Sequence, residues 1–111
     1  MTFSGVMTAL VTPMAQGAVD EDALRALVRA QIAGGIRGLV ACGSTGEAAT
    51  LTDDEQAHVV RIVVDEAAGR VPVISGVGAR STHGAIAEAQ RGVAAGADGL
   101  LVVTPAYNKP T

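Results

Sequence analysis

Short apolar runs divide the chain, and amphipathic stretches separate them. Runs of this length with few polar interruptions are typical of strands that are buried on both faces. We expect strands at Val6–Val11, Gly38–Cys42, Val71–Ser75 and Gly99–Val103. Between these runs, apolar residues recur every three or four positions, which predicts one helix in each interval. The resulting order, βαβαβαβ, indicates parallel strands with the helices outside the sheet.

Start and stop signals bound the first two helices. The first begins at Asp20–Asp22, whose negative charge suits a helix N-terminus, and it ends at Gly34–Gly35. The second has Thr52 as its N-cap, and Glu55 completes a capping box three residues later. Gly69 is expected to end this helix.

The remaining segments complete a repeating βα unit. The third helix is expected at Thr82–Ala95, and Met14–Val19 is expected to be a loop. Gly35–Val40 resembles Gly96–Leu101, because in both a helix stop leads through a glycine into a buried strand. This repetition favours an α/β fold of the (β/α)8, or TIM-barrel, type over a doubly wound sheet. The sequence also has no G-x-G-x-x-G after its first strand and no G-K-S/T, which weakens the nucleotide-binding alternatives.

The predicted strands amount to half of such a barrel. A barrel has eight strands and typically ~250 residues, whereas this chain has 111 residues and four predicted strands. We therefore interpret residues 1–111 as the N-terminal half of a single barrel domain. A half barrel leaves two sheet edges and an apolar inner face uncovered. The isolated chain is thus expected to be marginally stable or to self-associate.

Composition places the chain among globular proteins and argues against several function classes. It is 49% hydrophobic and 17% charged with a net charge of −3, which suits one small core. Mild acidity without a basic cluster argues against nucleic acid as a partner. The sequence has neither a signal-peptide pattern nor a run near the ~20 apolar residues of a membrane span, so we expect a cytoplasmic protein without a membrane partner. The single cysteine, Cys42, is interpreted as a core residue rather than a nucleophile.

Small and hydroxyl-bearing residues follow the second strand. The segment is Gly43-Ser44-Thr45-Gly46-Glu47, and in a parallel barrel the functional residues lie in the loops after the strands. Glycines let the backbone approach a ligand closely, and hydroxyls and free N–H groups can hold a carboxylate or phosphate. The same residues also fit a plain strand-to-helix turn, so both interpretations stay open at this point.

The other loops add few candidates. Tyr107 follows the fourth strand, where a phenol can relay a proton or pack beneath the loop. Arg80 lies in the loop after the third strand. Glu47 could act as a base, but a glutamate after a loop glycine more often accepts from backbone N–H groups. His58 and His83 fall on or beside predicted helices, so we predict no metal site and no cofactor.

Together these motifs resemble one enzyme family. The matching segments are Thr8–Pro13, Gly43–Leu51, Pro72–Ile74 with Gly76–Ala79, and Thr104–Pro110. In these segments the chain is similar to the pyruvate-dependent lyases that include dihydrodipicolinate synthase and N-acetylneuraminate lyase. Glu47–Leu51 and Tyr107–Pro110 favour the first branch. Ser44, where that branch usually has threonine, also occurs among the sialate lyases and related aldolases.

The resemblance implies a reaction and roles for particular residues. A lysine forms a Schiff base with pyruvate, the enamine attacks L-aspartate 4-semialdehyde, and the product cyclises to 4-hydroxy-tetrahydrodipicolinate, a step of lysine biosynthesis. The alternative is a sialate-lyase-like or other 2-keto acid aldolase. Ser44, Thr45 and Gly46, with their backbone N–H groups, would bind the pyruvate carboxylate, and Ser44 would also form a hydroxyl relay with Tyr107. The family's counterpart of Tyr107 reaches the neighbouring subunit's site, which implies a homodimer or homotetramer.

Two departures from the family pattern affect what the chain can do alone. Its only lysine, Lys109, lies in a loop, whereas the family's Schiff-base lysine lies on a later strand. The isolated chain is therefore expected to be inactive. The positions of the family's lysine-feedback site hold Asp53, Arg80, Gly84 and Ala106, so we expect an enzyme that is insensitive to lysine.

Two interpretations from other classes remain open. The glycine loops would also suit a phosphate- or nucleotide-binding α/β domain, which nucleotides would stabilise. The chain would also be compatible with an inactive half barrel that pairs with itself. This second interpretation describes the chain rather than the parent enzyme.

Overall fold

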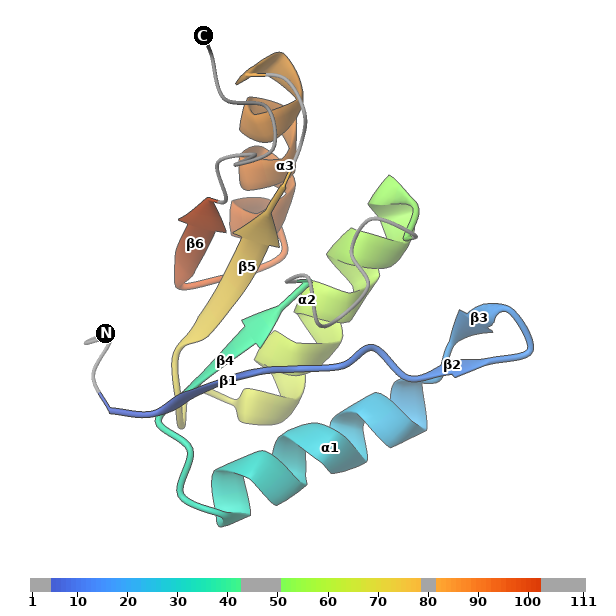
Figure 1. Cartoon of the computed structure of the whole chain (residues 1–111). Helices are drawn as coiled ribbons and strands as arrows, with labels where there is room; N and C mark the ends of the chain where they lie inside the picture. Colours follow the sequence, from blue (N-terminus) through green and yellow to red (C-terminus); the bar gives the residue numbers. More distant parts are fainter. Residues whose placement is uncertain (1–4, 43–50, 79–81, 103–111) are drawn as a thin grey trace, which may run out of the picture.

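A computed structural model describes residues 5–42, 51–78 and 82–102 of the chain. Parallel strands form a sheet in the order β1-β4-β5-β6, and the helices lie along it in chain order (Figure 1). The strands of this sheet are β1 (Met7–Ala9), β4 (Gly38–Ala41), β5 (Val73–Val77) and β6 (Gly99–Val102). The helices are α1 (Glu21–Ala33), α2 (Asp53–Ala67) and α3 (Thr82–Ala94). The predicted alternation of parallel strands and helices is confirmed.

Strand register brings the carboxyl ends of the strands to one edge of the sheet. Thr8 pairs with Leu39, and Leu39 pairs with Val73. The next pair, Ile74 with Gly99, continues the same parallel arrangement. The segments that follow β1, β4, β5 and β6 therefore leave the sheet at the same edge, where a parallel α/β fold places its functional loops.

The expectation for the segment between β1 and α1 was wrong. The segment Met14–Val19 was expected to be a loop, but it forms an antiparallel hairpin of β2 (Met14–Ala15) and β3 (Ala18–Val19). Gln16 and Gly17 form its turn with φ values of 54° and 80°, the conformation that matches the twist of a two-residue hairpin.

Strand β5 starts two residues later than expected and ends two residues later. Proline cannot donate a ladder hydrogen bond, and Pro72 precedes the strand instead of lying in it. The strand instead extends through Gly76, which pairs with Leu101. Strand β1 is also shorter than predicted, although the backbone N–H of Leu10 still donates to Val40 O at 3.0 Å.

The predicted helix signals are confirmed in detail. Asp20 is the N-cap of α1, and its side chain accepts from Ala23 N at 3.1 Å. Thr52 and Glu55 form the capping box of α2, with both reciprocal hydrogen bonds present. At the other end of α2, Ala68 adopts the left-handed conformation with φ of 51°, one residue before the predicted stop.

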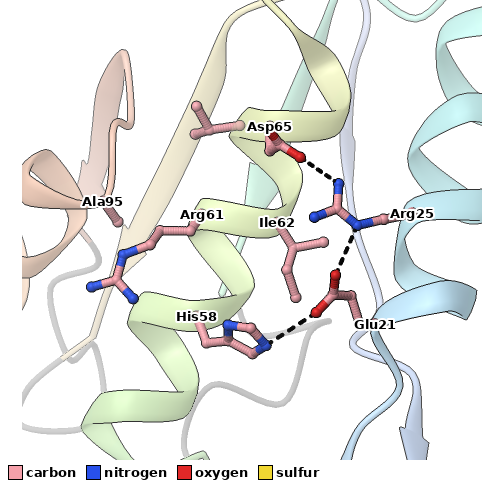
Figure 2. A pocket seen from close by; sticks show the side chains of 8 residues that line it. Glu21, Arg25, His58, Arg61, Ile62, Asp65 and Ala95 are labelled. Atoms are coloured by element: carbon pink, nitrogen blue, oxygen red, sulfur yellow. Dashed lines mark hydrogen bonds and ion pairs between the residues drawn. The ribbon is translucent and has the colours of Figure 1, made fainter.

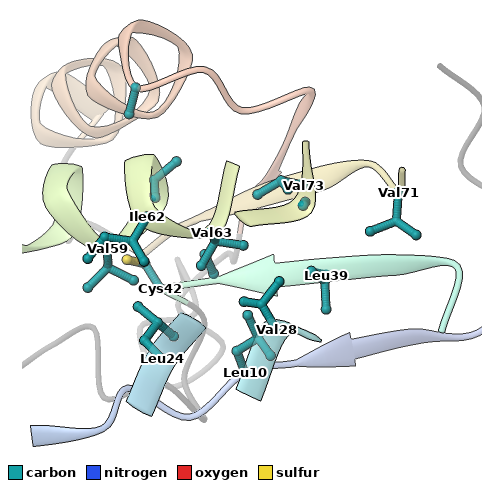
Figure 3. Close-up of a cluster of buried hydrophobic side chains, with 14 of the residues drawn as sticks. Leu10, Leu24, Val28, Leu39, Cys42, Val59, Ile62, Val63, Val71 and Val73 are labelled. Carbon is teal, nitrogen blue, oxygen red and sulfur yellow. The ribbon is translucent and has the colours of Figure 1, made fainter. Parts of the chain in front are cut away.

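The core lies where α1 and α2 pack on the sheet. Figure 3 shows Leu24 and Val28 of α1 facing side chains of α2 and of the strands. The fully buried members of this core include Leu24, Val28, Leu39, Val59, Val63 and Val73. This cluster fixes the helices against β4 and β5 and thus holds the carboxyl edge in place.

The edge strand β6 is not covered by the described residues. Leu100, Leu101 and Val102 are 37%, 47% and 62% exposed, so an apolar strand faces solvent. On the neighbouring helix α3, Ile86 and Val93 are also exposed. The expectation of uncovered sheet edges with apolar surface is confirmed for the part of the chain that the structure describes. In that part, no helix has the length and apolar character needed to cross a membrane.

Candidate functional site

The candidate site is expected at the carboxyl edge of the sheet, and the structure describes residues that border it. The predicted site residues Ser44, Thr45, Gly46 and Tyr107 lie outside the described residues, as do Glu47, Arg80, Ala106 and Lys109. The described residues that border them are Cys42 after β4, Leu51 before α2, and Gly78 after β5. The arrangement of these bordering residues decides how the candidate loops leave the fold.

Cys42 closes the end of β4 as a buried residue. It is 4% exposed, and its thiol Sγ lies 3.6 Å from the backbone oxygen of Gln56, to which it donates. Burial, with a smaller contribution from the negative charge of Glu88, raises the pKa of the Cys42 thiol to about 11. A thiol with this pKa is protonated at neutral pH and is a poor nucleophile. The interpretation of Cys42 as a core residue is confirmed.

Cys42 also turns the chain sharply. Its φ is 60°, which lies in the left-handed region that side chains other than glycine adopt at a cost. The backbone therefore leaves the direction of β4 at this residue. The Gly43–Glu47 segment starts directly after this turn.

The N-terminus of α2 fixes the other end of the same segment. The Thr52 hydroxyl accepts from Glu55 N at 3.1 Å, and the Glu55 carboxylate accepts from Thr52 N at 2.9 Å. In the first turn, Asp53 Oδ1 lies 3.2 Å from Arg91 Nη2 of α3. The segment that carries Ser44 and Thr45 thus lies between two fixed residues, Cys42 and Thr52.

The end of β5 is tied to α3 by a hydrogen bond that the sequence did not reveal. Gly78 N donates to Glu88 Oε2 at 2.9 Å. Glu88 and Arg91 were not among the predicted site residues, because polar residues on an amphipathic helix ordinarily face solvent. Their spacing of three residues places them on one side of α3, and this was the only signal in the sequence.

A groove in the helix layer gathers further charged groups. Figure 2 shows Glu21 and Arg25 of α1 facing His58 and Asp65 of α2 across it. Arg25 donates to Asp65 at 2.7 Å and to Glu21 at 3.0 Å, and these hydrogen bonds raise the pKa of Arg25 above its ordinary value. His58 Nε2 lies 3.6 Å from Glu21 Oε1. These paired charges join α1 to α2, so we assign the groove a structural role.

Both histidines lie on helices. His58 is on α2 and His83 is on α3, as expected. Among the described residues, no group of three or more histidine, cysteine, aspartate or glutamate side chains could hold a metal ion.

Comparison with known proteins identifies the family. The sequence matches the dihydrodipicolinate synthetase family over residues 2–111. The chain belongs to the dihydrodipicolinate synthetase family. It is 55% identical over 111 residues to the 4-hydroxy-tetrahydrodipicolinate synthase of Maridesulfovibrio salexigens, and the match covers 100% of this chain and 38% of the relative. The chain thus spans about two fifths of the length of its curated relatives.

Solved structures of the dihydrodipicolinate synthetase family place the fold. Dihydrodipicolinate synthase from Aquifex aeolicus aligns with a TM-score of 0.91 at 44% identity, over 98% of this chain and 37% of that one. The chloride-inhibited synthase from Acinetobacter baumannii, solved in complex with pyruvate, aligns with a TM-score of 0.93 at 44% identity over 99% and 38%. The described sheet and helices are part of a family barrel, which confirms the predicted (β/α)8 fold class.

Proposed function

We propose that the protein containing this chain condenses pyruvate with L-aspartate 4-semialdehyde to form 4-hydroxy-tetrahydrodipicolinate. The observation that carries the proposal is the 55% identity, over the whole chain, to a relative named for this synthase activity. A solved relative at 44% identity holds pyruvate, which supports pyruvate as one substrate. The sialate-lyase-like alternative has no comparable support.

The proposed reaction uses a lysine amine and loses one water. The amine condenses with the pyruvate carbonyl to an imine, and loss of a methyl proton gives the enamine. The enamine carbon attacks the aldehyde carbon, and the new alkoxide takes up a proton. The amino group of the former semialdehyde then attacks the imine carbon, which closes the ring and releases the lysine.

Ser44, Thr45 and Tyr107 supply the proposed contacts of this chain. Hydroxyl and backbone N–H groups at Ser44, Thr45 and Gly46 bind the pyruvate carboxylate. Ser44 also relays protons with Tyr107, because serine keeps the hydroxyl that a relay needs. Serine lacks the methyl group that restricts a threonine rotamer, so its hydroxyl is less firmly positioned. The fixed residues Cys42 and Thr52 support this proposal, since they hold the ends of the loop.

Three further features belong to the proposal. The enzyme works as a homodimer or homotetramer in which Tyr107 reaches the neighbouring site, and it is located in the cytoplasm. It is insensitive to lysine, because Asp53 stands at a feedback position of the family and its carboxylate is paired with Arg91 at 3.2 Å. A rate assay with added lysine tests this last point, and strong inhibition would contradict it.

A transplanted enzyme tests the proposed function. Residues 1–111 replace the matched segment of the Maridesulfovibrio salexigens relative, whose remaining length is expected to supply the rest of the barrel and the Schiff-base lysine. We expect the transplanted enzyme to consume pyruvate with aspartate semialdehyde. Thr45→Val and Tyr107→Phe should each lower kcat/KM by about tenfold or more, because each removes one hydroxyl. Cleavage of N-acetylneuraminate without synthase activity would instead favour the aldolase alternative.

A further inference from the structure

One side of α3 contacts both boundaries of the candidate site. Glu88 Oε2 accepts from Gly78 N at 2.9 Å, directly after β5. Arg91 Nη2 lies 3.2 Å from Asp53 Oδ1 in the first turn of α2. The two side chains are one helical turn apart, so a single helix ties the loop after β5 to the start of α2.

The carboxylate of Glu88 also affects Cys42, which follows β4. The negative charge of Glu88 contributes, after burial, to the raised pKa of the Cys42 thiol. Cys42 and Asp53 stand on either side of the segment that carries Ser44 and Thr45. Arg91 therefore contacts the α2 side of that segment, and Glu88 contacts the residue that follows β5.

Gly92 explains how α3 comes near enough for these contacts. A Cβ at position 92 would lie 2.9 Å from Ser75 Cβ and Oγ and 3.2 Å from Leu100 Cδ2. Only glycine permits this approach of the helix to β5 and β6. Ser75 is 4% exposed beneath the helix, which confirms the close packing. The close packing holds the backbone of α3 in place, so Glu88 and Arg91 are anchored on a fixed element.

Arg91 retains a further donor at this position. Its Nε is buried and has no hydrogen-bond partner among the described residues. Its Nη2 is engaged with Asp53. A buried donor without an acceptor is unfavourable, so the Arg91 side chain has the capacity to hold one more acceptor.

We propose that Glu88 and Arg91 are positioning residues that hold the end of β5 at Gly78 in register with the first turn of α2. Their removal is expected to weaken pyruvate binding, because these two anchors border the segments that carry the proposed contacts. The role of pyruvate as ligand rests on the proposed function, whereas the two anchors do not.

Hydrogen exchange on the full chain tests the placement without any substrate. Glu88→Ala should raise the exchange rate of the Gly78 amide by about tenfold or more, because a charge-assisted hydrogen bond is lost. Arg91→Ala should raise exchange across 51–55. Glu88→Gln keeps an acceptor and Arg91→Lys keeps the charge, so each should restore part of the protection. The control Arg29→Ala, which removes only an exposed pair with Glu66, should leave both regions unchanged.

The kinetic constants of the transplanted enzyme distinguish a positioning role of Glu88 and Arg91 from a general effect on stability. Glu88→Ala and Arg91→Ala should raise the KM for pyruvate by about tenfold while kcat changes less, and the conservative variants should recover part of the loss. A lower Tm with an unchanged KM would overturn the proposal, as would unchanged amide exchange in Glu88→Gln and Glu88→Ala alike. If the transplanted enzyme without further substitutions is inactive, the proposed function is overturned. The hydrogen-exchange result then decides the positioning role.

Discussion

Arg25 of α1 donates from Nη1 to Asp65 Oδ2 of α2 across 2.7 Å, and the same guanidinium also reaches Glu21 and Glu66. One cation thus stands among three carboxylates at the contact of two helices. The planar guanidinium can serve several oxygens at once, which a lysine ammonium cannot do with the same geometry. The contact joins α1 to α2 on the solvent side of the core that these helices share.

Removing this cation should weaken the contact between α1 and α2. In Arg25→Ala, the carboxylates of Glu21, Asp65 and Glu66 lose their shared partner and repel one another. We expect the Tm of Arg25→Ala to fall by a few degrees at low salt, and the Tm of Arg25→Lys to fall by less. The difference from the parent should shrink as salt screens the carboxylates. Thermal unfolding followed by circular dichroism measures both effects.

The control for this prediction is Arg61→Ala. Arg61 lines the same groove, but none of the ion pairs found among the described residues includes it. Its removal should leave Tm nearly unchanged. An equal loss in Arg25→Ala and Arg61→Ala would show that total charge, rather than the specific pairing, determines the stability.

The buried thiol of Cys42 predicts a loss of stability at alkaline pH. Burial raises its pKa from 9.0 to about 11, so the folded state holds a proton that the unfolded state has released. The folded state is thus favoured fully below pH 9.0 and loses this contribution as the pH rises towards 11. The loss amounts to about 2 kcal/mol. Urea unfolding at about pH 8 and about pH 11 measures it against Cys42→Ala, which should lack this part of the pH dependence.

A thiol reagent gives an independent test of the same residue. At neutral pH the native chain should react slowly, and the unfolded chain should react at the rate of an ordinary cysteine. Rapid modification of the native chain would contradict the burial of Cys42.

The close approach of α3 to the sheet predicts that position 92 tolerates only glycine. A methyl group in Gly92→Ala would lie 2.9 Å from Ser75 Cβ, so the helix must shift outward. We expect a loss of about 1–3 kcal/mol in the free energy of unfolding, as for other overpacked sites. The matched control is Gly34→Ala, where φ is −78° and the nearest atom lies at 3.4 Å. This control should change stability much less in chemical denaturation.

The features of the fold that depend on local sequence signals were predicted best. The capping box of Thr52 and Glu55 acts within one turn of helix and is present as predicted. Asp20, which was predicted only as part of a negatively charged helix start, is the N-cap of α1. The hairpin at Met14–Val19 was missed because its turn contains no strong Asn-Gly or Asp-Gly signal. The shift of β5 has a similar cause, since an apolar run alone does not fix which residues pair with Gly99.

The site was less predictable because its supports are distant in sequence. Glu88 and Gly78 are 10 residues apart, and their contact depends on how closely α3 packs on the sheet. No periodicity encodes that distance. Ser44, Thr45 and Tyr107 were singled out by their positions after predicted strands, and their roles came from the family resemblance. These roles stay predictions because the three residues lie outside the described residues.

The exposed strand β6 predicts that the isolated chain self-associates. Leu101 and Val102 are 47% and 62% exposed on an edge strand, which presents unpaired backbone groups beside apolar side chains. Sedimentation velocity of the chain should therefore show species larger than a monomer. Leu101→Lys with Val102→Lys should shift the chain towards the monomer, whereas Ala30→Lys, on the exposed side of α1, should not. A parent chain that stays monomeric at high concentration would contradict the prediction.

Trapping with pyruvate and borohydride tests whether residues 1–111 contain the Schiff-base nucleophile. The chain has one lysine, Lys109, whereas the family's Schiff-base lysine is expected on a later strand. We expect intact-mass measurement to show no stoichiometric adduct on the chain, and a full adduct on the transplanted enzyme, whose remaining segment supplies the expected lysine. Lys109→Arg in the transplanted enzyme should leave that adduct unchanged. A stoichiometric adduct that disappears in Lys109→Arg would instead place the nucleophile on this chain, and the assignment of the covalent step to a later strand would have to be abandoned.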